Sequence, residues 1–205
     1  MRSVLISIKP KWCELIASGK KTIEVRKTKP KLETPFKCYI YCTNTKPYLV
    51  WGDVFRGDWE TEFTHLSGYN RKEAEKIWDV FNGHVIGEFV CDSIEEIGFS
   101  PYNHGEYICK DQSFVEQSCV PFDEMFGYLG DGYGYGWHIS NLFIYDEPKK
   151  LSEFYTKCNE VCEDCYLWRY VRVNSEEFDM ECASEFYGHI PLKRPPQSWC
   201  YVEEM

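Results

Sequence analysis

The sequence predicts a mixed α+β fold, in which a small closed or half-closed β-barrel carries short helices inserted between its strands. About six segments are rich in β-branched and aromatic residues and are bounded by turn-forming residues. The helical segments do not alternate regularly with these strands, which argues against a parallel α/β sheet. Aromatic residues make up 17% of the 205 residues, as expected for a rigid, β-rich core.

The first half of the chain begins with a strand and a short helix. Residues 3–8 are rich in β-branched residues and predict a buried strand. A helix is expected next, because Pro10 suits a first helical position and Gly19 provides a C-terminal stop. Residues 38–43 predict a further strand. Residues 44–69 lack periodicity and contain several Trp, Gly and Asp residues, so we expect a loop or an insertion there.

The second half adds further elements. A helix is expected from a cap at Asn70 to the Asn-Gly pair that ends at Gly83. Further strands are predicted at 84–91, 137–145 and 198–203, and short helices near 121–129 and 151–155. The glycine ladder at 130–136 is expected to form a turn or, alternatively, a mobile lid.

These elements predict one domain with an appendage. Residues 1–155 would form the barrel domain, with an insertion at about 44–83. Residues 156–192 would form a cysteine-rich acidic appendage, and 193–205 a return strand packing on the barrel. The sequence shows neither a signal peptide nor a run of about 18 apolar residues, so we expect no membrane span and a cytoplasmic location.

Charge is distributed unevenly along the chain. The formal net charge is −10, which argues against a protein that coats nucleic acid or sits on anionic lipid. Residues 1–37 nevertheless contain ten Lys or Arg and three acidic residues, while the remainder is strongly acidic. A basic edge on an acidic body indicates one local anion site, and the alternative is a solvated charged face.

Residues 7–26 combine these charges with the end of the first predicted strand, the helix and its glycine stop. They also include a strand predicted at 22–26, where Thr22, Glu24 and Arg26 alternate with Ile23 and Val25. Lys9 stands at the helix start, and Lys21, Glu24 and Arg26 follow its end. Such an arrangement can hold a phosphate or a carboxylate, with Glu24 orienting the cations or accepting a hydrogen bond from a base edge. The alternative is a surface ion-pair cluster on an exposed strand face, which would contribute little.

This segment resembles the start of the ASCH domain family, which is related to PUA domains. The family pattern is a strand ending in Ser-Ile-Lys-Pro, a helix, and then Gly-x-Lys-x-x-Glu-x-Arg. Its four motif positions are occupied by Gly19, Lys21, Glu24 and Arg26. Three later segments also resemble family elements, namely residues 85–89, 136–142 and 194–202.

The resemblance implies a PUA-like β-barrel with a cleft that takes RNA, a nucleotide or a modified base, with any protein partner unknown. Trp12 could stack on such a base, and His138 could move protons. The predicted ligand-binding residues are Lys9, Trp12, Lys21, Glu24, Arg26 and His138.

An enzyme at the same cleft is the alternative. Some family members resemble single-strand ribonucleases, and one branch removes acetyl from N4-acetylcytidine with a lysine, a threonine nucleophile and a glutamate. Lys21 matches that lysine, but Glu24 stands where the branch has its threonine, and Thr22 would point differently. The departure argues against this second activity.

The eleven cysteines suggest a possible structural zinc site. Its ligands would be Cys158, Cys162, Cys165 and Cys182, with His189 as an alternative fourth ligand. In one continuous helix Cys158 and Cys165 would lie about 10 Å apart along the axis, so a zinc site requires the helix to stop between them. Reduced thiols on a packed helix face and disulfides are the alternatives, and the other seven cysteines are expected in the core.

Overall fold

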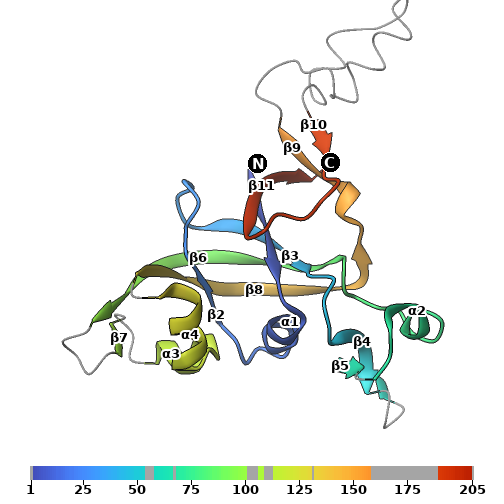
Figure 1. Cartoon of the computed structure of the whole chain (residues 1–205). Coiled ribbons are helices and arrows are strands. Elements are labelled where there is room, and N and C mark those ends of the chain that lie inside the picture. The colour runs from blue at the N-terminus through green and yellow to red at the C-terminus, as the bar shows by residue number, and fades with distance from the viewer. Residues whose placement is uncertain are drawn as a thin grey trace, which may run out of the picture.

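The computed structural model describes residues 2–53, 58–66, 68–100, 106–108, 113–130, 132–157 and 189–204. Within these ranges the chain forms a nine-stranded mixed sheet, a two-stranded hairpin and four short α-helices (Figure 1). The predicted mixed α+β class is therefore confirmed.

The elements are listed here in groups. The large sheet contains β1 (Ser3–Ile8), β2 (Ile23–Arg26), β3 (Phe36–Cys42), β6 (Val85–Ser100), β7 (Glu106–Ile108), β8 (Tyr133–Lys149), β9 (Phe154–Lys157), β10 (His189–Pro191) and β11 (Trp199–Glu204). The hairpin consists of β4 (Tyr48–Asp53) and β5 (Asp58–Leu66). The helices are α1 (Pro10–Ala17), α2 (Arg71–Ala74), α3 (Phe114–Ser118) and α4 (Phe122–Leu129), with a 3-10 turn at Leu151–Glu153.

The large sheet is open and does not close into the predicted barrel. Its strand order is β10-β9-β11-β1-β3-β6-β8-β2, with β7 added to β6. No backbone ladder in the described residues returns from β2 to β1. Instead, the Arg26 guanidinium donates a hydrogen bond of 2.6 Å to the Ser7 carbonyl oxygen. A charged side chain thus occupies the seam at which a closed barrel would need strand pairing.

The first elements form where the sequence predicts them. Pro10 opens α1, and Gly19 follows its end with φ of +71°, a conformation that glycine adopts without strain. Along β1, Val4 and Ile6 enter the main core, whereas Leu5 enters a cluster on the other side of the sheet. This alternation explains why all of β1 is buried.

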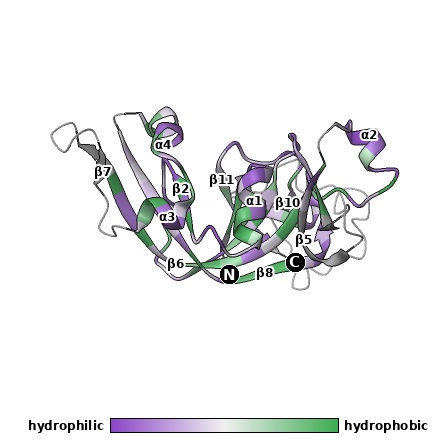
Figure 2. Cartoon of the chain, turned by 90° about the horizontal axis from the view of Figure 1, so that it is seen from below, coloured by the Kyte–Doolittle hydropathy of each residue, from purple (hydrophilic) through white to green (hydrophobic). Residues whose placement is uncertain are grey.

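In the view of Figure 2 the helices α1, α3 and α4 all appear above the curved strands β6 and β8. However, α3 and α4 pack against the face of β8 that carries Gly134 and Gly136, whereas α1 covers the opposite face, where Trp137 enters the main core. The main core under α1 includes Cys13, Ile16, Phe89 and Trp137. A second core joins β2 to α3 and α4, and it includes Ile23, Val25, Phe114, Met125 and Leu129. These two cores fix α1 and α4 on either side of β2.

Residues 44–69 form structure that the sequence analysis missed. Tyr48 to Leu66 pair as an antiparallel hairpin, so the predicted loop is wrong over this part. The strands were missed because the apolar contacts of β4 come from residues later in the chain. Val50, for example, forms a bridge with Val80 and shares a small core with Leu66.

The helix predicted from Asn70 is much shorter than expected. Asn70 and Glu73 form a capping box, as a helix start requires, but α2 ends after Ala74. The cap prediction is therefore confirmed and the predicted length is wrong.

The glycine ladder at 130–136 is largely strand. Gly134 and Gly136 lie within β8, so the turn or lid expected over 130–136 is wrong for residues 133–136. A Cβ atom at Gly134 would lie 2.7 Å from Leu129 Cδ1, and one at Gly136 would lie 2.4 Å from Phe114 Cε2. These glycines let the helices approach the sheet closely. Only Gly130, with φ of +70°, ends α4 in a turn.

The cysteine-rich segment lies mostly outside the described residues. Cys158, Cys162, Cys165 and Cys182 are all in this undescribed part, so the zinc site stays a prediction. The described part contains no cluster of His, Cys, Asp or Glu able to hold a metal. Of the seven cysteines expected in the core, Cys109 is also undescribed. Four are buried free thiols, namely Cys13, Cys38, Cys42 and Cys91. The other two, Cys119 and Cys200, are partly exposed free thiols.

The helices of the described ranges are all short. None of these helices is both long enough and apolar enough to span a bilayer.

Candidate functional site

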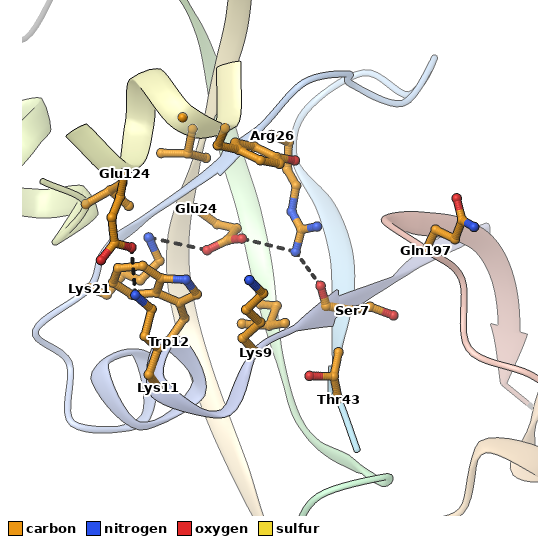
Figure 3. A pocket seen from close by; sticks show the side chains of 15 residues that line it. Ser7, Lys9, Lys11, Trp12, Lys21, Glu24, Arg26, Thr43, Glu124 and Gln197 are labelled. Carbon is orange, nitrogen blue, oxygen red and sulfur yellow. Dashed lines mark hydrogen bonds and ion pairs between the residues drawn. The ribbon is translucent and has the colours of Figure 1, made fainter. Parts of the chain in front are cut away.

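A cavity of about 480 Å³ lies at the seam between β1 and β2 (Figure 3). Its volume is in the range typical of small-molecule sites. Its wall combines residues of both strands, of α1 and of α4 with residues of the connecting loops. The polar and aromatic side chains that line the cavity include Ser7, Lys9, Lys11, Trp12, Lys21, Glu24, Arg26, Glu124, Tyr128 and Gln197.

The floor of the cavity is a buried ion cluster of Lys21, Glu24 and Arg26. Their residue exposures are 1%, 5% and 6%, respectively. One Glu24 oxygen lies 3.3 Å from Lys21 Nζ, and the other lies 3.0 Å from an Arg26 terminal nitrogen. Strand alternation explains the cluster, because Glu24 and Arg26 share one face of β2. The alternative of an exposed ion-pair cluster is therefore wrong.

Lys21 is held by three neighbours. Its Nζ donates a 2.6 Å hydrogen bond to the Ser118 carbonyl at the end of α3 and lies 5.1 Å from the Trp12 ring centroid. Burial lowers the pKa of Lys21, and the negative charge of Glu24 acts in the opposite direction. The floor thus carries two cationic side chains against one carboxylate.

Arg26 connects distant parts of the chain. Besides Ser7, its guanidinium contacts the Ser198 hydroxyl oxygen at 3.4 Å. Ser7 in turn donates a 2.7 Å hydrogen bond from its hydroxyl to the Pro196 carbonyl. The buried Arg26 Nε has no hydrogen-bond partner in the described part of the chain.

The mouth of the cavity carries two more lysines. Lys9 precedes α1, and its ammonium extends over the cavity in Figure 3. It forms no ion pair with a described residue. Lys11 pairs with Glu124 at 2.6 Å and lies 4.1 Å from the Trp12 ring centroid. The lining contains four cations against two carboxylates, so it favours an anion.

Comparison with known families supports the resemblance seen in the sequence. Residues 6–54 match the family model of the ASCH domain. The ASCH resemblance is confirmed over this segment. It contains the end of β1, α1 and β2, and therefore the whole floor of the cavity.

Three solved structures were also found to be similar. The crystal structure of ASCH from Zymomonas mobilis shares 14% identity at a TM-score of 0.48, covering 98% of this chain and 87% of that chain. A Tyr-to-Phe mutant of that protein shares 13% identity at a TM-score of 0.48, covering 98% of this chain and 90% of that chain. A Ser-to-Ala mutant shares 14% identity at a TM-score of 0.48, covering 98% of this chain and 88% of that chain. No curated protein matches this chain.

Five of the six predicted ligand-binding residues line one cavity, and all five lie in the ASCH segment: Lys9, Trp12, Lys21, Glu24 and Arg26. His138 does not line it. Its neighbour Trp137 points into the main core, so His138 points to the opposite face of β8. There its Nε2 lies 3.3 Å from a Glu95 oxygen.

Sequence reasoning missed the lining residues outside the ASCH segment. Glu124 and Tyr128 come from α4, whose other face buries Met125 and Leu129. The spacing of these apolar residues predicts which face of α4 is buried, but it does not predict that the other face lines a cavity. Gln197 lies in a loop that reaches the site through the hydrogen bonds of Ser7, and no local pattern indicates this.

Proposed function

We propose that this chain binds RNA or a nucleotide-sized ligand in the cavity, through a phosphate at the mouth and a base at the floor. The observation that carries the proposal is Lys9, an exposed cation at the mouth that no described carboxylate neutralises. A phosphate would supply the missing counter-charge.

The floor suits the polar edge of a base. Both Glu24 oxygens already face cations, so the charge that the floor presents to a ligand is mainly positive. Trp12 and Tyr128 provide aromatic walls for stacking. The acidic body of the protein disfavours an extended polyanion, so a short ligand fits the charge distribution better.

The arrangement favours binding over catalysis. Glu24 is engaged on both oxygens, which leaves it poorly placed as a general base. Thr22 hydrogen-bonds Gln117 and does not line the cavity, so it does not replace the missing threonine nucleophile. Cys13 is fully buried, and burial raises the pKa of its thiol, which disfavours the nucleophilic thiolate.

The first test is Lys9→Ala. Losing one charge-assisted phosphate contact is expected to weaken binding of 5′-mononucleotides about tenfold, or about 1.4 kcal/mol. Isothermal titration calorimetry with AMP, CMP, GMP and UMP measures this change.

The matched control is Lys76→Ala, which removes the same charge from an exposed position outside the cavity lining. It should leave affinity unchanged. Equal losses in the two variants, or no binding by the unaltered protein, would refute the proposal. Turnover of single-stranded RNA that is lost in Lys21→Met would favour the enzyme instead.

We also propose that the four cysteines at 158, 162, 165 and 182 hold one structural zinc. The proposal rests on their spacing alone. Metal analysis of the purified protein should give about one zinc per chain. A Cys162→Ser/Cys165→Ser variant should contain none, and zinc-free unaltered protein would contradict the assignment.

A further inference from the structure

A second group of cationic side chains lies next to the cavity, outside its lining. Lys27, Lys29 and Lys31 lie in the loop between β2 and β3, and all three are exposed. Arg2, just before β1, is exposed as well. These four residues are called the cation rim below. None of them lines the cavity.

The rim is continuous with the cavity. Arg26 belongs to the floor, and Lys27 is the next residue in the chain. The Lys27 ammonium lies 5.1 Å from the ring centroid of Tyr128, which is itself a wall of the cavity. A chain of phosphates leaving the cavity past Tyr128 would therefore meet Lys27 first.

Aromatic rings hold the more distant cations. Lys29 Nζ lies 4.9 Å from the Tyr135 ring centroid, and the Arg2 guanidinium carbon lies 4.1 Å from that of Tyr201. Such contacts are worth about 0.5–1 kcal/mol at exposed sites. They restrict the long side chains, so less conformational entropy is lost when the cations bind an anion.

The loop between β2 and β3 is also anchored, through one side chain and one backbone amide. Trp199 Nε1 donates a 3.0 Å hydrogen bond to the Thr28 hydroxyl, and the Lys31 amide donates one of 2.7 Å to the Tyr201 hydroxyl. Both partners belong to β11. The lysines therefore project from a loop that is attached to the sheet at two points.

Two carboxylates lie near the rim: Glu96 pairs with Lys29, and Glu203 stands beside Arg2 in the register of β1 and β11. Lys29 pairs with Glu96 at 3.1 Å, but both side chains are largely exposed, and such pairs are weak. Glu33 is the one carboxylate in the described loop between β2 and β3. A phosphate can replace Glu96 as the partner of Lys29 at small cost.

We propose that the cation rim binds the phosphates of a short single-stranded RNA whose terminal nucleotide occupies the cavity. This inference rests on the proposed function, and it extends the ligand from one nucleotide to several. The fixed order of cavity, Lys27, Lys29 and the Arg2–Tyr201 pair sets the path of the strand. Proteins that bind single-stranded RNA in this way contact its phosphates with cationic side chains and stack its bases on aromatic rings.

The test compares the four 5′-mononucleotides with the four homopolymeric RNA octamers. The unaltered protein should bind its preferred octamer at least about tenfold more tightly than the mononucleotide. In Arg2→Ala/Lys29→Ala/Lys31→Ala this gain should disappear, while mononucleotide binding stays the same. The slope of log affinity against log salt should fall by about 2, at about 0.7 per lost phosphate contact.

A charge-matched variant, Lys46→Ala/Lys72→Ala/Lys76→Ala, removes three exposed lysines that do not belong to the rim. It should still bind the octamer more tightly than the mononucleotide. An equal loss in this control would overturn the rim as a specific path. Mononucleotide binding without an octamer gain would overturn the rim and leave the proposed function standing. Absence of both kinds of binding would overturn both.

Discussion

Glu24→Ala is expected to destabilise the fold by about 3–5 kcal/mol, the usual cost of removing one partner from a buried ion pair. The substitution would leave Lys21 and Arg26 buried without the carboxylate that now lies 3.3 Å and 3.0 Å from them. Burial already lowers the pKa of Lys21, and loss of Glu24 removes a contribution that raises it. The expected consequence is neutralisation of Lys21 or local unfolding around the cavity.

Urea unfolding of Glu24→Ala and Lys21→Met provides the measurement. Lys21→Met removes the cation together with its desolvation cost, so it should lose clearly less stability than Glu24→Ala. Glu24→Gln keeps the side-chain shape and serves if the alanine variant does not fold. Unfolding free energies for Glu24→Ala and Glu24→Gln within about 0.5 kcal/mol of the unaltered protein would contradict the structural role assigned to this carboxylate.

Gly136→Ala is expected to cost about 1–3 kcal/mol through overpacking. The new Cβ atom would stand 2.4 Å from Phe114 Cε2 and 3.0 Å from Ile23 Cγ2, and Phe114 is fully buried. Relief requires α3 to move away from the sheet. Because α3 ends at the carbonyl that holds Lys21, the cavity floor should be disturbed and ligand affinity reduced as well.

Gly127→Ala is the matched control. Gly127 lies inside α4, and a Cβ atom there would meet no atom within 4 Å. Alanine in a helix interior should stabilise the protein by about 0.5–1 kcal/mol. Thermal or urea unfolding should therefore shift in opposite directions for the two glycine variants. A shift of the same sign would show that packing at Gly136 is not as tight as the structure indicates.

Local signals in the sequence accounted for the first elements and most of the cavity floor. Pro10 and Gly19 bound α1, and the alternation of residues 22–26 places Glu24 and Arg26 together. These are contacts between neighbours in the chain, for which periodicity carries the information.

The remaining features depend on residues that are distant in sequence. Closure of the sheet was predicted wrongly because the occupant of the β1–β2 seam, Arg26, is decided by tertiary contacts. Tyr128 and Gln197 reach the cavity only through packing of α4 and the loop before β11. His138 was misplaced because a sequence shows which residues alternate along a strand, but not which face of that strand carries the ligand.

The junction at Arg26 has a consequence for biosynthesis. It unites Ser7 with Ser198, and β1 obtains its antiparallel neighbour only from β11. These partners lie nearly two hundred residues apart in the sequence. A nascent chain that already contains every lysine of the cavity therefore still lacks one wall of the cavity. The lining of the cavity is therefore complete only after translation has passed β11, and an isolated N-terminal fragment is expected not to form the cavity.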